Sequence, residues 1–373
     1  MPDRKKTAGK PPRASRRQRD VPTISDVAAH AGVSPMTVSR VINDRNSVRE
    51  STREKVQRSI DALNYAPSAA ARSLAGGEEM RIGLLYSNPS SSYLSEFLVG
   101  GLEQASRHNV HLLVEQFEEG SPIADLVQHL QRGRLNGIIL PPPLCDLPEM
   151  VEALQDAGIP SISVATSPSG RGTAVVSIDD RRAGAEMTRH LIALGHSRIG
   201  FIRGNPNQRA SELRYEGYAA ALAEAGLEPD PALISQGFFT YRSGLDAAEQ
   251  ILDLPEPPTA IFASNDDMAA ATVAVAHRRG LDVPGDLTVC GFDDTLLATT
   301  IWPELTTIRQ PISDMSRAAV DLMVRHLRSA RPADGAENGG EETPHVLLDY
   351  ELVRRQSDAA PRRRPRHRAA AKK

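Results

Sequence analysis

The chain has few features of a secreted, membrane-bound or metal-binding protein. Its 373 residues include only two cysteines, Cys145 and Cys290, which stand far apart and share no motif with histidine. Such isolated cysteines indicate neither a disulfide framework nor a metal site. No apolar run approaches the roughly 20 residues that span a bilayer, and the first residues lack the apolar core of a secretory signal. We therefore expect a cytoplasmic protein with no membrane partner.

Motifs of catalysis are also missing. The first expected strand leads into SNPSSSYL and not into a G-x-G-x-x-G turn, and the chain has no GK[ST], no HExxH and no Ser/His/Asp order of a hydrolase. His108, His129 and His196 stand on expected helices or turns without neighbouring ligands. The sequence therefore predicts neither an enzyme nor a bound cofactor or metal.

Positive charge is scarce in the middle of the chain and dense at both ends. Residues 1–76 contain 15 Lys and Arg against 7 Asp and Glu, and residues 354–373 contain 9 against 1. The segment between them carries a net charge of −19, although the whole chain carries only −3. A basic head on an acidic body is typical of a protein in which one end neutralises nucleic-acid phosphates.

Residues 23–43, TISDVAAHAGVSPMTVSRVIN, have the pattern of a helix–turn–helix. Thr23 and Asp26 would form a capping box at the start of a first helix, and Gly32 would supply the positive φ that ends it. Ser34 and Pro35 would then begin a second helix with an N-cap and a proline at its first position. The outer side of this helix would present to a major groove Pro35, Met36, Thr37, Ser39 and Arg40.

Two further elements distinguish this pattern from two short helices of an ordinary domain. Ser51 and Glu54 suit a second capping box before another amphipathic helix, and NYAPSAAARSLAGG follows at 64–77. With residues 23–43, these segments resemble the signature of the lac repressor (LacI/GalR) family of bacterial regulators, and the resemblance extends to about residue 353. It implies that the DNA-contacting residues also include Thr23, Asn43, Tyr65, Ala71 and Leu74.

From residue 80 onward, short apolar runs alternate with amphipathic helices, which predicts an α/β fold of parallel sheets covered on both faces. These alternating strands and helices are too many for one sheet. We therefore expect two doubly wound subdomains with a ligand cleft at the carboxyl ends of their strands, and the resemblance implies a periplasmic-binding-protein type of core. Expected strands are 82–86, 110–115, 137–140, 161–164, 174–178, 198–202, 260–262, 287–291 and 345–353. Expected helices include 186–194, 215–225 and 317–328.

These patterns divide the chain into five segments. We expect a disordered basic arm at 1–20, a helix–turn–helix domain at 21–66 and a hinge helix with linker at 67–79. An effector-binding and dimerisation core would occupy 80–353, and a disordered basic tail 354–373. The resemblance implies that the hinge helix pairs with its twin, where Leu74 would wedge between base steps from the minor groove.

The resemblance also places effector-binding residues in motifs near strand ends. SELRYEGY carries an arginine, GFFTYRSG an aromatic residue, and FASNDDMA and VCGFDD an amide and a carboxylate. Each has a structural interpretation too, as a salt-bridge arginine, a packed ring or a helix cap. Some relatives have an aspartate at the position where this chain has Ala165. This difference weakens any assignment of those relatives' particular sugar to this chain. The implied residues are Ser87, Tyr93, Phe97, Arg214, Phe239, Asn265 and Asp293.

The resemblance implies a homodimeric repressor of carbohydrate uptake and catabolism genes that acts on nucleoid DNA. Paired heads would bind a palindromic operator, and a neutral sugar or glycoside in the cleft would change operator affinity. Two other interpretations remain, namely a binding protein of transport type with the same core and a doubly wound enzyme. The helix–turn–helix segment argues against the first, and the missing catalytic motifs argue against the second.

Overall fold

The computed structural model describes residues 22–43, 48–65, 80–87, 90–118, 120–166, 173–329 and 344–362. The chain forms two compact units, residues 1–79 and residues 80–373. The arm expected at 1–20 and the hinge expected at 67–79 lie outside the described residues. Each unit is described by itself below.

The described residues of the first unit form three helices, α1 (Ile24–Ala31), α2 (Pro35–Asn43) and α3 (Glu50–Ala62). The first capping box is confirmed, because the Asp26 amide donates to the Thr23 hydroxyl and the Asp26 carboxylate accepts from the Thr23 amide. Gly32 ends α1 with a φ of 64°, as the turn requires. The helices meet over an apolar core that includes Val27, Ala28, Val38, Val41 and Val56.

The second expected capping box is wrong. α3 begins at Glu50, with Arg49 at the N-cap position and no side-chain hydrogen bond to cap it. Ser51 therefore lies inside the first turn and not before it. The helix starts earlier because Glu50 suits the positive N-terminal end of the helix dipole and pairs with Arg53, whose Nη1 lies 2.8 Å from its carboxylate.

We expect Thr23→Ala to destabilise the first unit by about 1 kcal/mol, since an N-cap hydroxyl is lost. The change should appear as faster amide hydrogen exchange in α1 of the full chain. Ser51→Ala is the matched control, because this serine does not cap α3. Equal exchange in the two variants would contradict the importance of the first cap.

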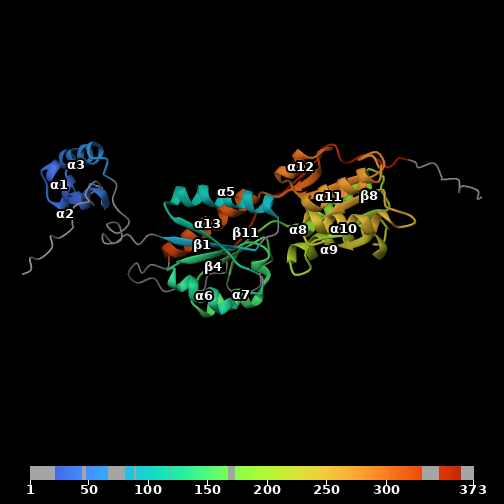
Figure 1. Cartoon of the computed structure of the whole chain (residues 1–373), viewed down its shortest axis with the longest axis horizontal. Coiled ribbons are helices and arrows are strands. Elements are labelled where there is room, and N and C mark those ends of the chain that lie inside the picture. The colour runs from blue at the N-terminus through green and yellow to red at the C-terminus, as the bar shows by residue number, and fades with distance from the viewer. Residues whose placement is uncertain are drawn as a thin grey trace, which may run out of the picture. The chain divides into compact units, whose positions relative to one another are not determined.

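Within the second unit, a first subdomain is built on a parallel six-stranded sheet in the order β11-β5-β4-β3-β1-β2. Two helices, α5 (Ser91–His108) and α13 (Ile312–Ser329), cover one face, and α6 (Ile123–Arg132) and α7 (Pro148–Asp156) cover the other (Figure 1). Central strands are apolar along their length because both faces are covered. The strands are β1 (Arg81–Tyr86), β2 (His111–Gln116), β3 (Gly137–Leu140), β4 (Ser161–Val164), β5 (Ala174–Ser177) and β11 (His345–Leu347).

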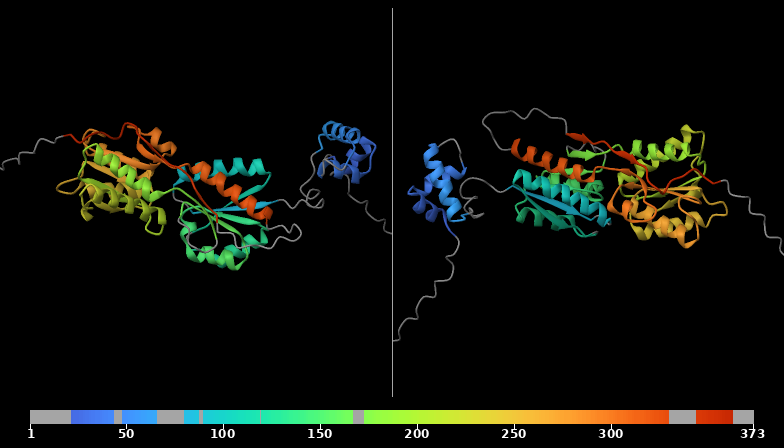
Figure 2. Two further views of the ribbon diagram at one scale, coloured as in Figure 1. Left: turned by 180° about the vertical axis from the view of Figure 1, so that it is seen from behind. Right: turned by 90° about the horizontal axis from the view of Figure 1, so that it is seen from above.

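A second subdomain has a six-stranded sheet in the order β12-β10-β9-β8-β6-β7, parallel except for β12. Its strands are β6 (Ile199–Arg203), β7 (Ile234–Gln236), β8 (Ala260–Ala263), β9 (Thr288–Asp293), β10 (Thr306–Arg309) and β12 (Glu351–Val353). The helices are α8 (Asp180–Ala193), α9 (Arg209–Glu224), α10 (Tyr241–Leu252), α11 (Asp266–Arg278) and the short α12 (Leu296–Thr300). The chain passes between the two sheets after β5, after β10 and between β11 and β12 (Figure 2). The expected pair of doubly wound subdomains is therefore confirmed.

Several expected boundaries need correction. Helices α8, α9 and α13 begin earlier than expected. The first turns of α8 and α9 are largely polar and lack the apolar spacing of the later turns, whereas the first turn of α13 already buries Ile312 and Met315. Strands β7 and β10 were not expected at all. The single strand expected at 345–353 is two strands, since β11 pairs with β5 and β12 pairs with β10 in the other sheet. Periodicity does not reveal which sheet an apolar run will join.

The expectation of a disordered tail at 354–373 is wrong for residues 354–362, which pack against the second subdomain. The fully buried Ser357 donates its hydroxyl to the Val289 carbonyl. Asp358 lies 2.8 Å from His190 Nε2, and Arg355 forms an ion pair with Asp294 at 2.6 Å. The arginines that suggested a solvated tail thus alternate with residues buried in the fold. Residues 363–373 lie outside the described part of the chain.

Candidate functional site

The outer side of α2 is the candidate DNA-contacting surface of the first unit. Met36 is 66% exposed, and Pro35 and Arg40 are also exposed. Thr37 and Ser39 are half-buried, while two valines of the same helix face the core. An apolar and a cationic side chain thus stand free on one helix face, as contact with base edges and phosphates requires.

The other expected DNA contacts are placed differently. Thr23 is exposed, but its hydroxyl lies 2.7 Å from the Asp26 carboxylate as part of the cap. The Tyr65 ring is buried in the core of the unit with 7% exposed. The side chain of Asn43 and the whole of Ala71 and Leu74 lie outside the description. DNA contacts by these residues remain predictions.

A small cavity lies in the second unit at the carboxyl ends of strands from both sheets. This edge is where doubly wound sheets bind ligands. The expected residues that line it are Tyr93, Arg214, Phe239, Asn265 and Asp293. Lining residues that were not expected to bind effector are Ser90, Pro142, Ala165, Gln208, Ala210 and Gln310.

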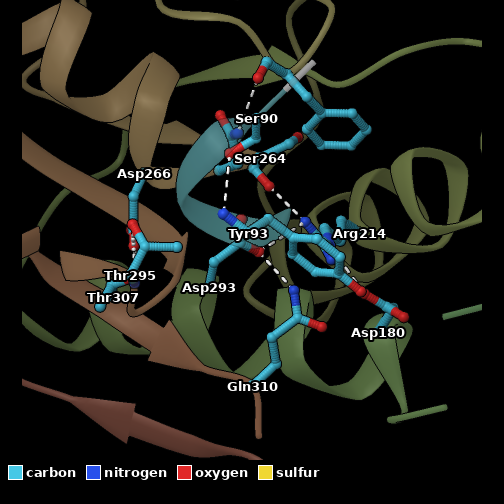
Figure 3. A network of polar contacts seen from close by, with 12 residues as sticks. Ser90, Tyr93, Asp180, Arg214, Ser264, Asp266, Asp293, Thr295, Thr307 and Gln310 are labelled. Atoms are coloured by element: carbon cyan, nitrogen blue, oxygen red, sulfur yellow. Dashed lines mark hydrogen bonds and ion pairs between the residues drawn. The ribbon is translucent and has the colours of Figure 1, made fainter. Parts of the chain in front are cut away.

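Arg214, which is 4% exposed, is held rigidly at the centre of this site (Figure 3). Its Nε donates to Asp180 at 2.8 Å, and its Nη1 donates to the Ser264 carbonyl at 2.6 Å. Nη1 also lies 3.6 Å from Asp293, and the guanidinium stacks 3.6 Å from the centre of the Phe292 ring. Nη2 has no partner among the described residues and remains available to a ligand.

The close packing of α8 on α9 brings Arg214 to Asp180. A Cβ added at Gly184 in α8 would lie 2.6 Å from the Arg214 carbonyl oxygen. A Cβ added at Gly217 in α9 would lie 2.1 Å from the Arg181 carbonyl oxygen. Only glycine at these two positions allows the helices to approach so closely, so the ion pair depends on both.

Asp293 is the second charged group of the cavity. It accepts a hydrogen bond from Gln310 Nε2 at 2.6 Å (Figure 3). Burial raises the pKa of Asp293 well above its usual range, although Arg214 lowers it; Asp266 raises it further. Burial also raises the pKa of Asp266 to about 7, although the Thr307 hydroxyl and the Thr295 amide donate to its carboxylate. The site therefore holds more buried carboxyl groups than cationic groups, and burial favours their uncharged form.

Three residues of the cavity wall have left-handed backbone. The φ angles of Ala165 and Phe239 are 59°, and that of Asp293 is 113°. Such conformations cost non-glycine residues roughly 1–3 kcal/mol each and gather at functional sites. Asn265 secures one of them, since its Nδ2 donates to the Phe239 carbonyl at 3.1 Å while its Oδ1 caps α11. Asn265 thus positions the wall as well as lining it.

Two expected effector residues do not reach the cavity. Phe97 is fully buried and stacks beneath Tyr93 with 6.2 Å between ring centres, because one helical turn separates the two. Ser87 follows β1 but does not line the cavity either. Ser90, the N-cap of α5, does, and its hydroxyl donates to Asp267 of the second subdomain at 2.7 Å.

The two glutamines of the cavity were missed for different reasons. Gln208 occupies the N-cap position of α9, a helix expected to begin only after it. Gln310 directly follows β10, and a strand expected there would have identified it as a strand-end residue. In the described part of the chain, no group of three His, Cys, Asp or Glu residues could hold a metal ion. None of the described helices is long and apolar enough to cross a membrane.

Comparison with known proteins gives consistent similarities. Residues 23–68 match the family of bacterial regulatory proteins, lacI family, and residues 188–357 match a periplasmic binding protein-like domain. Catabolite control protein A of Priestia megaterium is 34% identical over 307 residues, which are 82% of this chain and 92% of that protein. The lac repressor dimer bound to operator and the anti-inducer ONPF has a TM-score of 0.76 at 28% identity, covering 91% of this chain and 100% of that one. A complex of the transcriptional regulator CelR with cellobiose has a TM-score of 0.67 at 30% identity, covering 90% and 99%.

Proposed function

The chain belongs to the lacI family of bacterial regulatory proteins, and we propose that it represses genes of carbohydrate uptake and catabolism under the control of a small saccharide. The observation that carries the proposal is the combination, in one chain, of an exposed recognition helix and a buried polar cavity between two sheets. The helix–turn–helix unit distinguishes the chain from a transport-type binding protein, which would need only the core. Because its relatives regulate transcription, we propose no enzymatic activity, and we place its action on nucleoid DNA in the cytoplasm.

Two copies of α2, one from each protomer, are proposed to enter the major groove of a palindromic operator. Met36, Thr37 and Arg40 are the proposed base contacts, with Pro35 and Ser39 beside them on the same helix. Asn43, Tyr65 and Thr23 are proposed to contact the DNA as well. Ala71 and Leu74 are proposed to enter the minor groove, with Leu74 wedged between base steps.

The direct test is filter binding of the full chain to a palindromic DNA selected from a randomised pool, with and without neutral saccharides. An effector that couples to DNA binding by about 1–3 kcal/mol would change operator affinity by about 5- to 150-fold. If the selection enriched no DNA sequence, the proposal that the chain is a sequence-specific DNA-binding regulator would be contradicted. Sequence-specific binding without any response to small molecules would contradict only the effector control.

Arg40→Ala is expected to weaken binding to the selected operator by about 5- to 150-fold for each half-site, because a bidentate arginine–guanine pair contributes roughly 1–3 kcal/mol of discrimination. Binding to random DNA should survive, and a repeated selection should show relaxed preference at one position of each half-site. Arg58→Ala on α3, where the side chain is also exposed, is the matched control. An equal loss on operator and random DNA would make Arg40 a phosphate contact instead.

The effector is proposed to bind in the cavity lined by Arg214, Asn265, Asp293 and Phe239. The arginine and the carboxylate suit pairs of sugar hydroxyls, and the aromatic ring suits an apolar sugar face. The CelR complex with cellobiose supports this choice of ligand class. A ligand that contacts both subdomains would favour one arrangement of them over another, which is how it would alter DNA binding.

A further inference from the structure

Four helices of the first subdomain end at the edge of its sheet where the strands begin. In a parallel sheet a connecting helix returns the chain to that edge, as α5, α6 and α7 do. α13 runs alongside α5 in the same direction, because Ser313 donates to the Glu96 carbonyl at 3.0 Å and Asp321 pairs with His108 farther along both helices. We call this end of the first subdomain its amino edge, and β1 starts there (Figure 1).

Six arginines of the amino edge lack an acidic partner. None of them forms an ion pair with an Asp or Glu residue in the described part of the chain. Five are exposed and the first is half-buried. The carboxyl groups at the ends of the same elements are few, namely Asp321, which pairs with His108, and Asp156 at the end of α7. The arginines are Arg81 at the start of β1, Arg107 in α5, Arg132 and Arg134 at the end of α6, and Arg325 and Arg328 in α13.

Most other arginines of the second unit are paired. Arg189 lies 2.8 Å from Glu224, and Arg279 lies 2.8 Å from Asp253. Pairing is the ordinary outcome here, because residues 77–353 carry a net charge of −19. The dipole of a helix favours a cation in its last turn, but α7 has none there, and Arg81 and Arg134 belong to no helix. Helix ends alone therefore do not explain the cluster.

The amino edge is also the place where the chain arrives from the helix–turn–helix unit. Residues 66–79 connect that unit to the start of β1, and 14 residues span at most about 50 Å when fully extended. This reach corresponds to roughly 15 base pairs of duplex DNA. When the first unit is bound to DNA, the amino edge therefore stays within reach of the same duplex.

The charge of the edge suits the DNA backbone. Arginine presents a fork of donors that matches phosphate oxygens, and phosphates recur along every duplex whatever its sequence. The acidic remainder of the second unit is repelled by DNA, so this unit can approach a duplex favourably only with its amino edge. One arginine supports another here, since Arg81 Nη1 donates to the Gly133 carbonyl at 2.6 Å and so secures the turn that presents Arg134.

We propose that the amino edge is a second DNA-binding surface, whose exposed arginines contact phosphates of the duplex that the recognition helices read. This inference rests on the operator binding of the proposed function and adds a surface to it. Contacts to phosphates raise affinity and its dependence on salt, but they do not select a sequence. The amino edge thus differs from Arg40, whose loss is expected to relax sequence preference.

Two double variants test the surface, Arg132→Gln with Arg134→Gln and Arg325→Gln with Arg328→Gln. Filter binding of the full chain is measured between about 50 and 200 mM salt, on the selected operator and on a random duplex of equal length. Each phosphate contact contributes about 0.9 to the slope of log affinity against log salt concentration, so each double variant should make the slope shallower by at least about 1. Both DNAs should be affected alike, and the ratio of the two affinities should stay within about twofold.

The matched control is Arg181→Gln with Arg242→Gln on the second subdomain. These exposed arginines pair with Glu216 and Asp246, so the control removes the same charge from another place. Its slope should equal that of the parent. Thermal melting shows that every variant remains folded. Hydroxyl-radical footprinting should show backbone positions that the parent protects and the double variants expose, while protection of both half-sites persists.

An unchanged slope in either double variant overturns the inference. Unchanged slopes in both would indicate an acidic protein partner for the edge, such as segment 331–343 of this chain, which carries four carboxylates. A loss confined to the operator, or an equal change in the control, overturns the inference too, because the first reports sequence reading and the second net charge. A parent that selects no DNA sequence overturns the proposed function instead.

Discussion

Arg214→Met is expected to reduce saccharide affinity by about 100-fold or more, because charge-assisted hydrogen bonds contribute roughly 1.5–3 kcal/mol each. Operator binding without effector should persist, so the variant should be unresponsive. The same substitution leaves Asp180 and Asp293 buried without their cation. Removing one partner of a buried ion pair costs about 3–5 kcal/mol, so the second subdomain should also unfold more easily.

The stability loss should grow as the pH rises. Burial raises the pKa of Asp293 and of Asp180 in the folded protein, and in each case Arg214 opposes the shift. A carboxyl whose folded pKa lies above its unfolded pKa stabilises the fold at low pH and loses that contribution as pH rises through the folded value. Thermal melting at about pH 5 and about pH 8 should therefore show a smaller difference from the parent at the lower pH.

The double variant Arg214→Met with Asp180→Asn separates stability from binding. Neutralising Asp180 removes one uncompensated charge, so melting should recover towards the parent while saccharide binding stays lost. Arg181→Ala, which removes an exposed pair with Glu216 at 3.8 Å, is the matched control and should change neither property. Full effector response in Arg214→Met would refute the placement of the effector at this arginine.

The helix–turn–helix could be predicted residue by residue because its rules are local. A capping box, a glycine with positive φ and apolar spacing act within a few residues, and Thr23, Asp26 and Gly32 adopt the expected conformations. The same local rule failed at Ser51, because a capping motif does not itself state where a helix starts. The alternation of strands and helices was equally visible, since buried parallel strands are continuous apolar runs.

The cavity could be predicted only in part. Arg214, Phe239, Asn265 and Asp293 were identified through family motifs, and the parallel topology brings them together at one edge of the sheet. Gln208 carries no local signal, and Gln310 could have been found only through β10, the strand that the sequence analysis missed. Phe97 shows the opposite failure, as helical spacing does not tell a ring that faces a ligand from one that lies beneath it. Ser357 and Asp358 were hidden among arginines for the same reason: burial depends on distant partners.

The surface of the second unit suggests how two copies of the chain pair. Val99 and Leu102 on α5 are 53% and 51% exposed, and Val114 on the neighbouring β2 is 40% exposed. On the second subdomain, Leu296 of α12 and Trp302 just after it are each 74% exposed. In Figure 1, α5 and α12 lie along the same side of this unit. Exposed apolar side chains are typical of an interface, and we propose that those of α5, β2 and α12 form the interface of the homodimer.

Leu102→Asp is therefore expected to convert the dimer to a monomer at micromolar concentration, because it places an unpaired charge in an apolar interface. Operator affinity should fall by about 100-fold or more, since binding of one head no longer holds the second at high effective concentration. Sedimentation velocity measures the first effect and filter binding the second, and calorimetry with the saccharide should remain unchanged because the cavity lies within one chain.

Leu347→Asp is the matched control for this surface. Leu347 is 58% exposed, so it resembles Leu102 in type and exposure, but it lies on β11 at the opposite edge of the sheet from β2. A monomer produced by Leu347→Asp and not by Leu102→Asp would move the interface to the other edge. A Leu102→Asp monomer that bound the operator as tightly as the parent would contradict the two-headed mode of binding itself, because one head would then supply the whole affinity.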